Sequence, residues 1–79
     1  MKSARINLST TVKQMVALIV YLKRGRRTIN EIRDEMDVNR VTVYRRVRAL
    51  KEAGVPVQDD YIPGDRGEMV MWINREWRL

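Results

Sequence analysis

The stretch from Asn39 to Gly54, NRVTVYRRVRALKEAG, constrains the fold of this chain more than any other. Asn39 is a good helix N-cap, and Gly54 suits the left-handed residue that follows a helix. Val43, Val47 and Leu50 recur at i, i+4 and i+7, which predicts one apolar stripe on a helix of about four turns. The opposite face and its edges carry a different set of side chains: Val41, Thr42, Tyr44, Arg45, Arg48 and Glu52. One side therefore suits a core, and the other, rich in arginine, suits an anionic partner.

The charge of the chain is concentrated in two segments. The net charge is +6 over 79 residues. Residues 1–27 carry seven Lys and Arg and no acid, and residues 38–54 carry five bases against one acid, whereas residues 28–37 carry four acids. Residues 55–79 have three bases and five acids. A localised positive charge on a small domain indicates a polyanionic partner.

Several function classes are disfavoured by the residues that the chain lacks. There is no cysteine and no histidine, so disulfides, thiolate metal sites and the usual general base are missing. Asp59 and Asp60 are adjacent in a predicted strand, so they point to opposite faces and cannot easily share a ligand. We therefore expect no enzyme, no catalytic residue, no metal and no cofactor. No apolar run reaches the roughly 18 residues of a membrane span and no signal peptide is apparent, which predicts a cytoplasmic protein.

The N-terminal third predicts a first helix. Arg5–Leu8 alternates and suggests a minor strand within a short extension over residues 1–8. Thr11 and Gln14 match a capping box, which places the start of the helix near Thr11. Apolar residues then follow at helical spacing as far as Gly25, and these are Val12, Met15, Leu18, Ile19 and Leu22.

A second helix follows at once and meets the third across a tight turn. Thr28 and Glu31 form a second capping box, and the apolar pattern ends near Asp37. Only Asp37 and Val38 separate this helix from the Asn39 cap, which is helix-turn-helix geometry. In the preceding linker, Arg26 and Arg27 have two interpretations: a solvated turn or a phosphate contact.

After Gly54 the pattern changes to extended structure. Two strand-like runs surround a turn cluster at residues 63–67, which predicts a hairpin over residues 55–73 and a short tail over 74–79. The whole chain, 1–79, is then a single α+β domain. Three helices lie within residues 11–54, and the hairpin stands beside them as a C-terminal wing.

The amino-acid sequences of three segments resemble those of a known family. These segments are Thr28–Ile32, Asp37–Arg45 and Arg48–Pro56, and they are similar to the short winged helix-turn-helix domains of bacterial biotin ligase repressors and sugar-metabolism repressors. The resemblance covers roughly residues 11–67. It implies that the third helix enters the major groove of DNA and that the wing lies along the backbone or the minor groove.

The resemblance assigns DNA-facing positions, each of which also has a structural interpretation. Arg45 and Arg48 can fork onto guanine or phosphate, or form a solvated face with an Arg48–Glu52 pair. Tyr44 can reach a phosphate or be partly buried, and Thr42 can contact a base or bond within the first turn. The full set of DNA-binding candidates is Asn39, Arg40, Val41, Thr42, Tyr44, Arg45 and Arg48, with Arg66 on the wing and Arg26 and Arg27 in the linker.

The chain departs from the family pattern at two positions. The family usually has Gly where Asp37 stands, and Asp tolerates the left-handed conformation, so the turn is expected to survive. The family usually has Ala where Arg33 stands, so Arg33 must extend outward or widen the packing. Arg46 lies nearer the core, and we expect it to pair with an acid of the second helix.

These features predict sequence-specific binding of double-stranded DNA by a small transcriptional regulator or repressor, or by an accessory factor of a phage or mobile element. The alternative is a protein-interaction module that docks polymerase, a recombinase or another partner. The acidic hairpin near Trp72 and Trp77 is the feature that suggests it. RNA binding is weaker, because A-form RNA closes its major groove to a helix. The sequence leaves the oligomeric state open.

Overall fold

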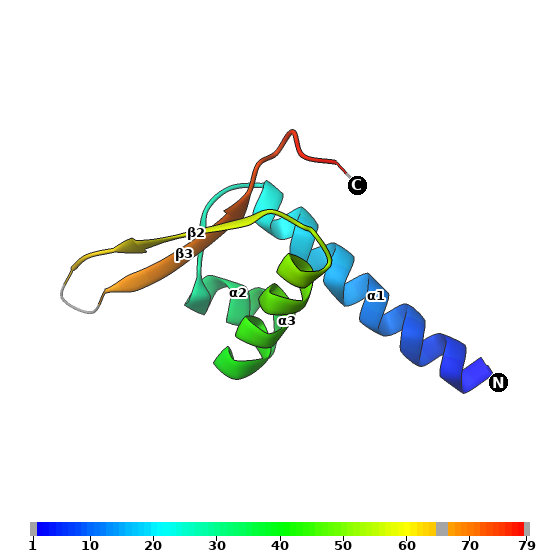
Figure 1. Cartoon of the computed structure of the whole chain (residues 1–79). Coiled ribbons are helices and arrows are strands. Elements are labelled where there is room, and N and C mark those ends of the chain that lie inside the picture. The colour runs from blue at the N-terminus through cyan, green and yellow to red at the C-terminus, as the bar shows by residue number, and fades with distance from the viewer. Residues whose placement is uncertain (1, 65–66, 79) are drawn as a thin grey trace.

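The computed structural model describes residues 2–64 and 67–78, with side chains described from residue 11 onward. Within these residues it contains three helices and a three-stranded sheet. The elements in chain order are α1 (Lys2–Lys23), β1 (Arg27–Thr28), α2 (Ile29–Met36), α3 (Arg40–Glu52), β2 (Val57–Ile62) and β3 (Glu68–Ile73). Figure 1 shows α2 and α3 beneath the sheet, with the β2–β3 hairpin extending to one side and α1 to the other. The predicted α+β winged-helix architecture is confirmed.

The sheet is antiparallel, with strand order β1-β3-β2. The hairpin register pairs Val57 with Ile73 and Tyr61 with Met69. On the other side of β3, Arg27 pairs with Met71. The sequence did not predict β1, because a strand of two residues has no periodicity and exists only through its pairing with β3.

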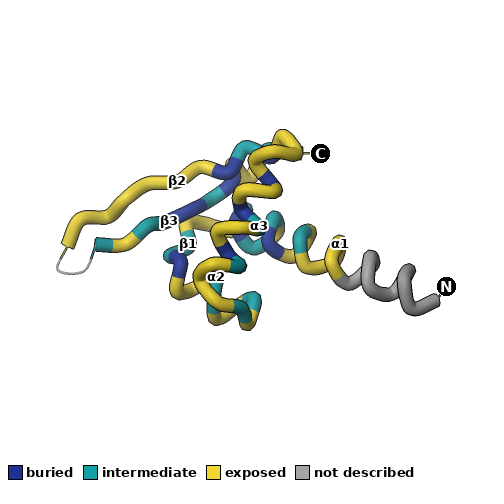
Figure 2. Tube along the Cα trace, turned by 60° about the horizontal axis from the view of Figure 1, so that its bottom comes forward, coloured by how far each residue is buried: buried dark blue, intermediate teal, exposed yellow. Residues whose placement is uncertain are grey.

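The core lies where the three helices meet the inner half of the sheet (Figure 2). Leu22 and Ile32 are fully buried, and Leu18 and Val43 are 1% exposed. The predicted apolar stripe of α3 is confirmed, since Val43, Val47 and Leu50 are all buried. The outer part of the hairpin extends beyond this core, and β2 is exposed from Gln58 onward.

The turn between α2 and α3 has the predicted geometry. Thr28 caps α2 with a reciprocal capping box, in which its hydroxyl accepts from the Glu31 backbone and the Glu31 carboxylate accepts from the Thr28 N–H. Asp37 adopts the left-handed conformation, with φ 54° and ψ 51°. Asn39 then caps α3 through a bond of 2.8 Å from the Thr42 N–H to Asn39 Oδ1. A short polar side chain thus replaces the usual glycine and keeps the turn intact.

The end of α3 also matches the sequence prediction. Gly54 has a φ of 95°, a conformation that L side chains rarely adopt. The Val55 N–H reaches back to the Leu50 carbonyl at 2.9 Å, which satisfies one of the last free carbonyls of the helix. The chain therefore leaves α3 directly into β2, and this connection fixes where the wing begins.

The prediction for the N-terminus was wrong. Residues 5–8 form no strand, and the helix does not begin at Thr11, because α1 runs without interruption from Lys2 to Lys23. The segment before Thr11 contains neither Gly nor Pro, so nothing in it ends a helix. Thr11 therefore lies inside the helix, where the capping pattern with Gln14 has no orphan N–H group to satisfy.

The sequence allowed two outcomes for Arg33, a side chain that extends outward or a wider packing of the helices, and the structure lies between them. Its side chain is half-buried, and its Nη1 atom donates to Asn30 Oδ1 at 3.4 Å. Its Nε atom is buried with no hydrogen-bond partner in the described structure. The Nη1 end of the guanidinium thus reaches the surface, while Nε and the aliphatic stem stay against α2.

Candidate nucleic-acid interface

The outer face of α3 is exposed along its length. Val41 is 61% exposed and Tyr44 is 42% exposed. Arg40, Arg45 and Arg48 are exposed as well. Because Val43, Val47 and Leu50 anchor the opposite face, these side chains are held on a rigid helix and point away from the core. The structure therefore brings together the predicted arginines, Tyr44 and Val41 on one surface, which we call the α3 face.

Some polar groups at the first turn of α3 are already used in capping the helix. Asn39 is exposed, but its side-chain oxygen accepts the Thr42 N–H. Thr42 itself is half-buried, at the edge of the α3 face. The cap fixes the direction in which the helix starts, and so it positions Arg40 and Val41.

Arg48 forms the predicted pair with Glu52. Its Nε atom lies 3.2 Å from Glu52 Oε1, and the two side chains are 83% and 70% exposed. An exposed pair of this kind contributes about 0–1 kcal/mol and is screened by salt. A phosphate or a base edge can therefore replace the carboxylate at small cost.

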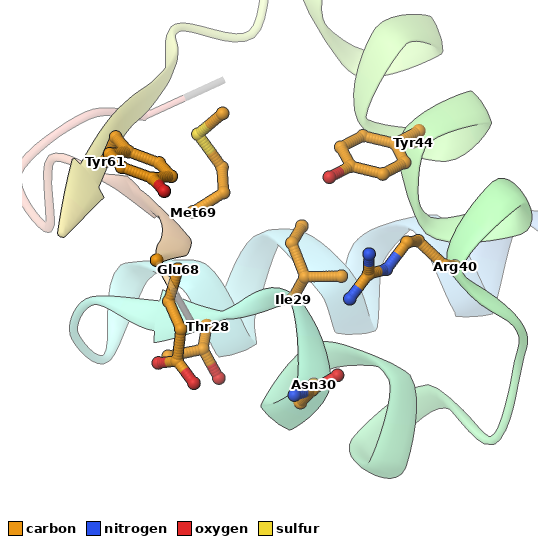
Figure 3. A pocket seen from close by; sticks show the side chains of 9 residues that line it. Thr28, Ile29, Asn30, Arg40, Tyr44, Tyr61, Glu68 and Met69 are labelled. Atoms are coloured by element: carbon orange, nitrogen blue, oxygen red, sulfur yellow. The ribbon is translucent and has the colours of Figure 1, made fainter. Parts of the chain in front are cut away.

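A hollow of about 410 Å³ lies between the α3 face and the wing (Figure 3). Arg40 and Tyr44 contribute one wall from α3, and Tyr61 contributes the other from β2. Both tyrosine hydroxyls point into the space between them, and Ile29 lies at the base. Thr28 and Asn30, at the start of α2, complete the lining with Gly67, Glu68 and Met69.

Tyr61 is a site residue that sequence reasoning missed. The sequence places it only within the strand-like run before the turn cluster, but it is 58% exposed and lines the hollow. It is held against Gly67 across the hairpin, where a Cβ would overlap the tyrosine ring and hydroxyl. Gly67 has a φ of 64°. An aromatic residue diagonal to a turn glycine was the available signal, because such pairs pack across a hairpin.

The acids of the wing are placed unequally. Asp59 Oδ2 accepts from Lys51 Nζ at 2.8 Å, so this pair joins β2 to α3. Asp60 Oδ1 accepts the N–H of Tyr61 at 2.8 Å. Glu68 lines the hollow, next to Thr28 and with its carboxylate turned away from the tyrosines. Part of the negative charge of the wing, that of Asp59, is therefore neutralised by Lys51 of α3.

The two linker arginines are engaged with aromatic rings. The guanidinium carbon of Arg26 lies 4.1 Å from the centroid of the Trp72 ring, and that of Arg27 lies 4.4 Å from the centroid of Tyr21. Arg27 is half-buried, and its Nε atom is buried without a hydrogen-bond partner in the described structure. Neither residue lines the hollow. These contacts give both arginines a role in packing around the sheet.

Two further sequence predictions concern arginines. The sequence predicted that Arg46 pairs with an acid of α2, and this was wrong. Its Nη2 atom instead donates to Gln14 Oε1 of α1 at 2.8 Å. The reason is that Arg46 lies on the flank of α3 that faces α1. Arg66, the predicted wing contact, lies outside the described residues.

The described part of the chain contains neither a metal-binding cluster nor a membrane-spanning helix. No group of three or more His, Cys, Asp or Glu within that part of the chain lies close enough to hold a metal ion. Among the helices of residues 2–64 and 67–78, none combines the length and the apolar character needed to span a membrane.

A tight α2–α3 turn, an exposed basic α3 and an adjacent hairpin together define a winged helix-turn-helix domain. Comparison with protein families agrees: the family model described as "HTH domain" matches residues 11–60. The chain belongs to this family. No curated protein and no solved structure matches the chain.

Proposed function

We propose that this protein binds double-stranded DNA in a sequence-dependent way, with α3 in the major groove. The observation that carries the proposal is the α3 face, where Arg45 and Arg48 stand exposed on a helix whose opposite side is anchored in the core. Arginine forks bind guanine or phosphate in bidentate fashion, and an exposed Val41 offers an apolar contact for a thymine methyl group. The geometry suits a reader of base edges on a rigid element.

The hollow beside α3 suits one strand of the DNA backbone. Arg40 brings a positive charge, and the hydroxyls of Tyr44 and Tyr61 face each other across the space. Contacts of this kind to phosphate position a protein on the duplex without reading its sequence. The wing then contacts the backbone through Tyr61, and the candidate contact of Arg66 adds to it.

In the cell, this activity fits a small transcriptional regulator, or an accessory factor of a phage or mobile element, acting in the cytoplasm. Fluorescence anisotropy of a labelled random-sequence duplex over a salt series tests the first step. We expect log affinity to fall with log salt at a slope of about −4 to −6, for roughly five to seven phosphate contacts. Selection from a random duplex pool then tests sequence dependence, and failure to enrich any site would limit the protein to non-specific binding.

A second candidate function is docking of a protein partner through the wing. The observation that favours it is the exposure of Tyr61 and Ile62, which are 58% and 51% exposed on β2. Trp72 and Trp77 support it less, because both are half-buried, Trp72 beneath Arg26 and Trp77 against the core. A stoichiometric complex with a partner, combined with no measurable duplex affinity at low salt, would favour this function over DNA binding.

A further inference from the structure

A second hollow lies where the C-terminal tail meets the end of α1. It has a volume of about 470 Å³ and is lined by Val20, Lys23, Arg24 and Arg75. The tail is held beside α1 because Lys23 Nζ donates to the Trp77 carbonyl at 2.6 Å (Figure 1). Three of the four lining residues are basic and none is acidic, so we call this space the basic hollow.

The chain itself does not neutralise the bases around this hollow. Arg24 and Arg75 are exposed, and among the described residues neither guanidinium has a hydrogen-bond or ion-pair partner. Lys23 gives one of its three ammonium hydrogens to Trp77. α1 contains four bases and no acid, so it supplies no carboxylate either. Like charges that converge on one space repel one another, and an anion bound between them offsets this repulsion.

An apolar stripe along α1 leads into the basic hollow. Val12, Val16 and Val20 are 59%, 47% and 44% exposed, and we call these three residues the valine stripe. Val20 belongs to the stripe and also lines the hollow. Seen down the helix axis, the three valines, Lys13 and Lys23 lie within an arc of about 100°. This exposed side of α1 therefore has an apolar centre with a base at either end.

This surface faces away from the candidate DNA interface. Gln14 Oε1 of α1 accepts from Arg46 Nη2 of α3 at 2.8 Å, so the Gln14 side of α1 faces α3. Val16 follows Gln14 by two residues, and the two side chains therefore point about 160° apart around the helix. No described residue of α1 or of the tail lines the hollow between α3 and the wing. A duplex bound to the α3 face leaves the valine stripe and the basic hollow uncovered.

We propose that the valine stripe and the basic hollow together bind an acidic amphipathic helix of another protein. Such a helix lays apolar residues spaced at i, i+4 and i+7 on an apolar surface. Its carboxylates at one end reach the basic hollow, where Arg24 and Arg75 can each bind a carboxylate in bidentate fashion. A carboxylate at the other end reaches Lys13. The charges fix the position of the helix, and the valines provide most of the affinity, because exposed ion pairs contribute little.

The valines distinguish this partner from a nucleic acid. A duplex presents phosphates, and a phosphate placed over apolar side chains loses water without gaining a hydrogen bond. An amphipathic helix instead matches the apolar centre with apolar residues and the basic ends with acids. A second copy of the chain does not match through α1, because the four bases of one helix would face the four bases of the other. The contact belongs to the small, transient class of interfaces.

A nuclear magnetic resonance titration of the isotope-labelled protein tests the surface directly. The probe is a synthetic helical peptide with leucines at i, i+4 and i+7 and glutamates near both ends. We expect it to shift the amide signals of residues 12–24 and of Arg75, and to leave those of residues 40–48 in place. A peptide of the same composition in scrambled order is the control, and its shifts should be much smaller because it has no apolar side. Equal shifts for the two peptides, or shifts confined to α3, would overturn the proposal.

Variants of the protein and of the peptide test the charged part of the contact. Arg24→Ala/Arg75→Ala should weaken peptide binding about three- to tenfold, because two exposed ion pairs are lost. The same double variant should have little effect on a peptide in which glutamine replaces glutamate, since the partner charges are then absent. Equal losses with both peptides would contradict the pairing of charges in the basic hollow.

Two outcomes would assign the surface to another occupant. A duplex that binds Arg24→Ala/Arg75→Ala more weakly than the wild type would assign the basic hollow to nucleic acid. Shifts of the amides of residues 12–24 with protein concentration, in the absence of peptide, would assign the valine stripe to a second copy. The peptide titrations do not involve DNA, so their failure leaves the proposed function intact.

Discussion

The two long helices of this domain expose opposite kinds of surface. α3 exposes arginines, Tyr44 and one valine, whereas α1, from residue 11 onward, exposes Lys13 and three valines, Val12, Val16 and Val20. Both helices are anchored in the same way, by buried aliphatic residues on one side: Leu18 and Leu22 in α1, and Val43, Val47 and Leu50 in α3. The two helices are therefore alike in their buried side chains and differ in their exposed side chains.

This difference predicts a different response to salt at the two surfaces. Charge on a rigid helix favours a polyanion, to which binding is strong at low salt and weak at high salt. An apolar stripe favours another protein surface, to which binding responds little to salt. A domain of this size can thus carry two independent surfaces on one small core, and substitutions that separate them give the clearest tests.

The largest expected effect is on stability, and it separates the buried side of α1 from its exposed side. Leu18 is 1% exposed, so Leu18→Ala should lower the free energy of unfolding by about 2–5 kcal/mol. Val16→Ala, measured in dilute protein, should stay within about 0.5 kcal/mol of the wild type. Urea unfolding followed by circular dichroism measures both. A Val16→Ala loss equal to that of Leu18→Ala would mean that Val16 is buried in the dilute protein.

The next effect concerns the α3 face. Arg45→Ala and Arg48→Ala should each weaken specific duplex binding by about 1–3 kcal/mol, because each removes a base or phosphate contact. Ala17→Ser, at an exposed position of α1, is the control and should leave duplex affinity unchanged. Anisotropy titrations at one fixed salt concentration provide the comparison. Wild-type affinity in both arginine variants would rule out α3 as the reading helix.

A smaller effect is expected at the start of α3. Asn39→Ala removes the acceptor of the 2.8 Å bond from the Thr42 N–H, and the expected loss of stability is about 1 kcal/mol. Asn39→Asp is the matched control, since aspartate also caps well. Thermal unfolding of the wild type and the two variants measures how much the cap contributes to stability. Equal losses in the two variants would show that the amide group matters for some reason other than capping.

The smallest effect is expected for the ion pair on the α3 face. Glu52→Gln removes the negative charge paired with Arg48 and should change the free energy of unfolding by less than about 1 kcal/mol. Duplex affinity should rise, because Arg48 loses a competitor for phosphate and the face loses a negative charge. Combining Glu52→Gln with Arg48→Ala checks the cause, since the gain should shrink when Arg48 is absent. A lower affinity in Glu52→Gln alone would give Glu52 a direct role in base recognition.

Much of the fold could be predicted because local signals agreed with one another. The Thr28 capping box, the Asn39 cap and Gly54 each fix a helix end through bonds within a few residues. The stripe of Val43, Val47 and Leu50 fixes which side of α3 is buried. The wing was predictable from its turn cluster and its apolar runs.

The parts that could not be predicted depend on contacts distant in the sequence. Strand β1 exists through pairing with β3, and the Arg46–Gln14 bond joins residues 32 apart in the chain. The N-terminus of α1 was mispredicted because a good capping pattern at Thr11 also fits the interior of a longer helix. Of the predicted site residues, those on α3 lie on one face, whereas Arg26 and Arg27 are engaged with Trp72 and Tyr21. Tyr61 was missed because its place in the hollow depends on where the wing lies relative to α3.

The most direct test of the central claim compares two double variants of equal charge. Arg45→Ala/Arg48→Ala removes two bases from the α3 face, and Arg75→Ala/Arg78→Ala removes two exposed bases from the tail. Duplex affinity is measured by anisotropy over the same salt series. We expect the α3 variant to lose most of the affinity and to flatten the salt slope by about 1–2 units, while the tail variant stays close to the wild type. Equal losses in the two variants would show that only net charge attracts DNA, and would contradict recognition through α3.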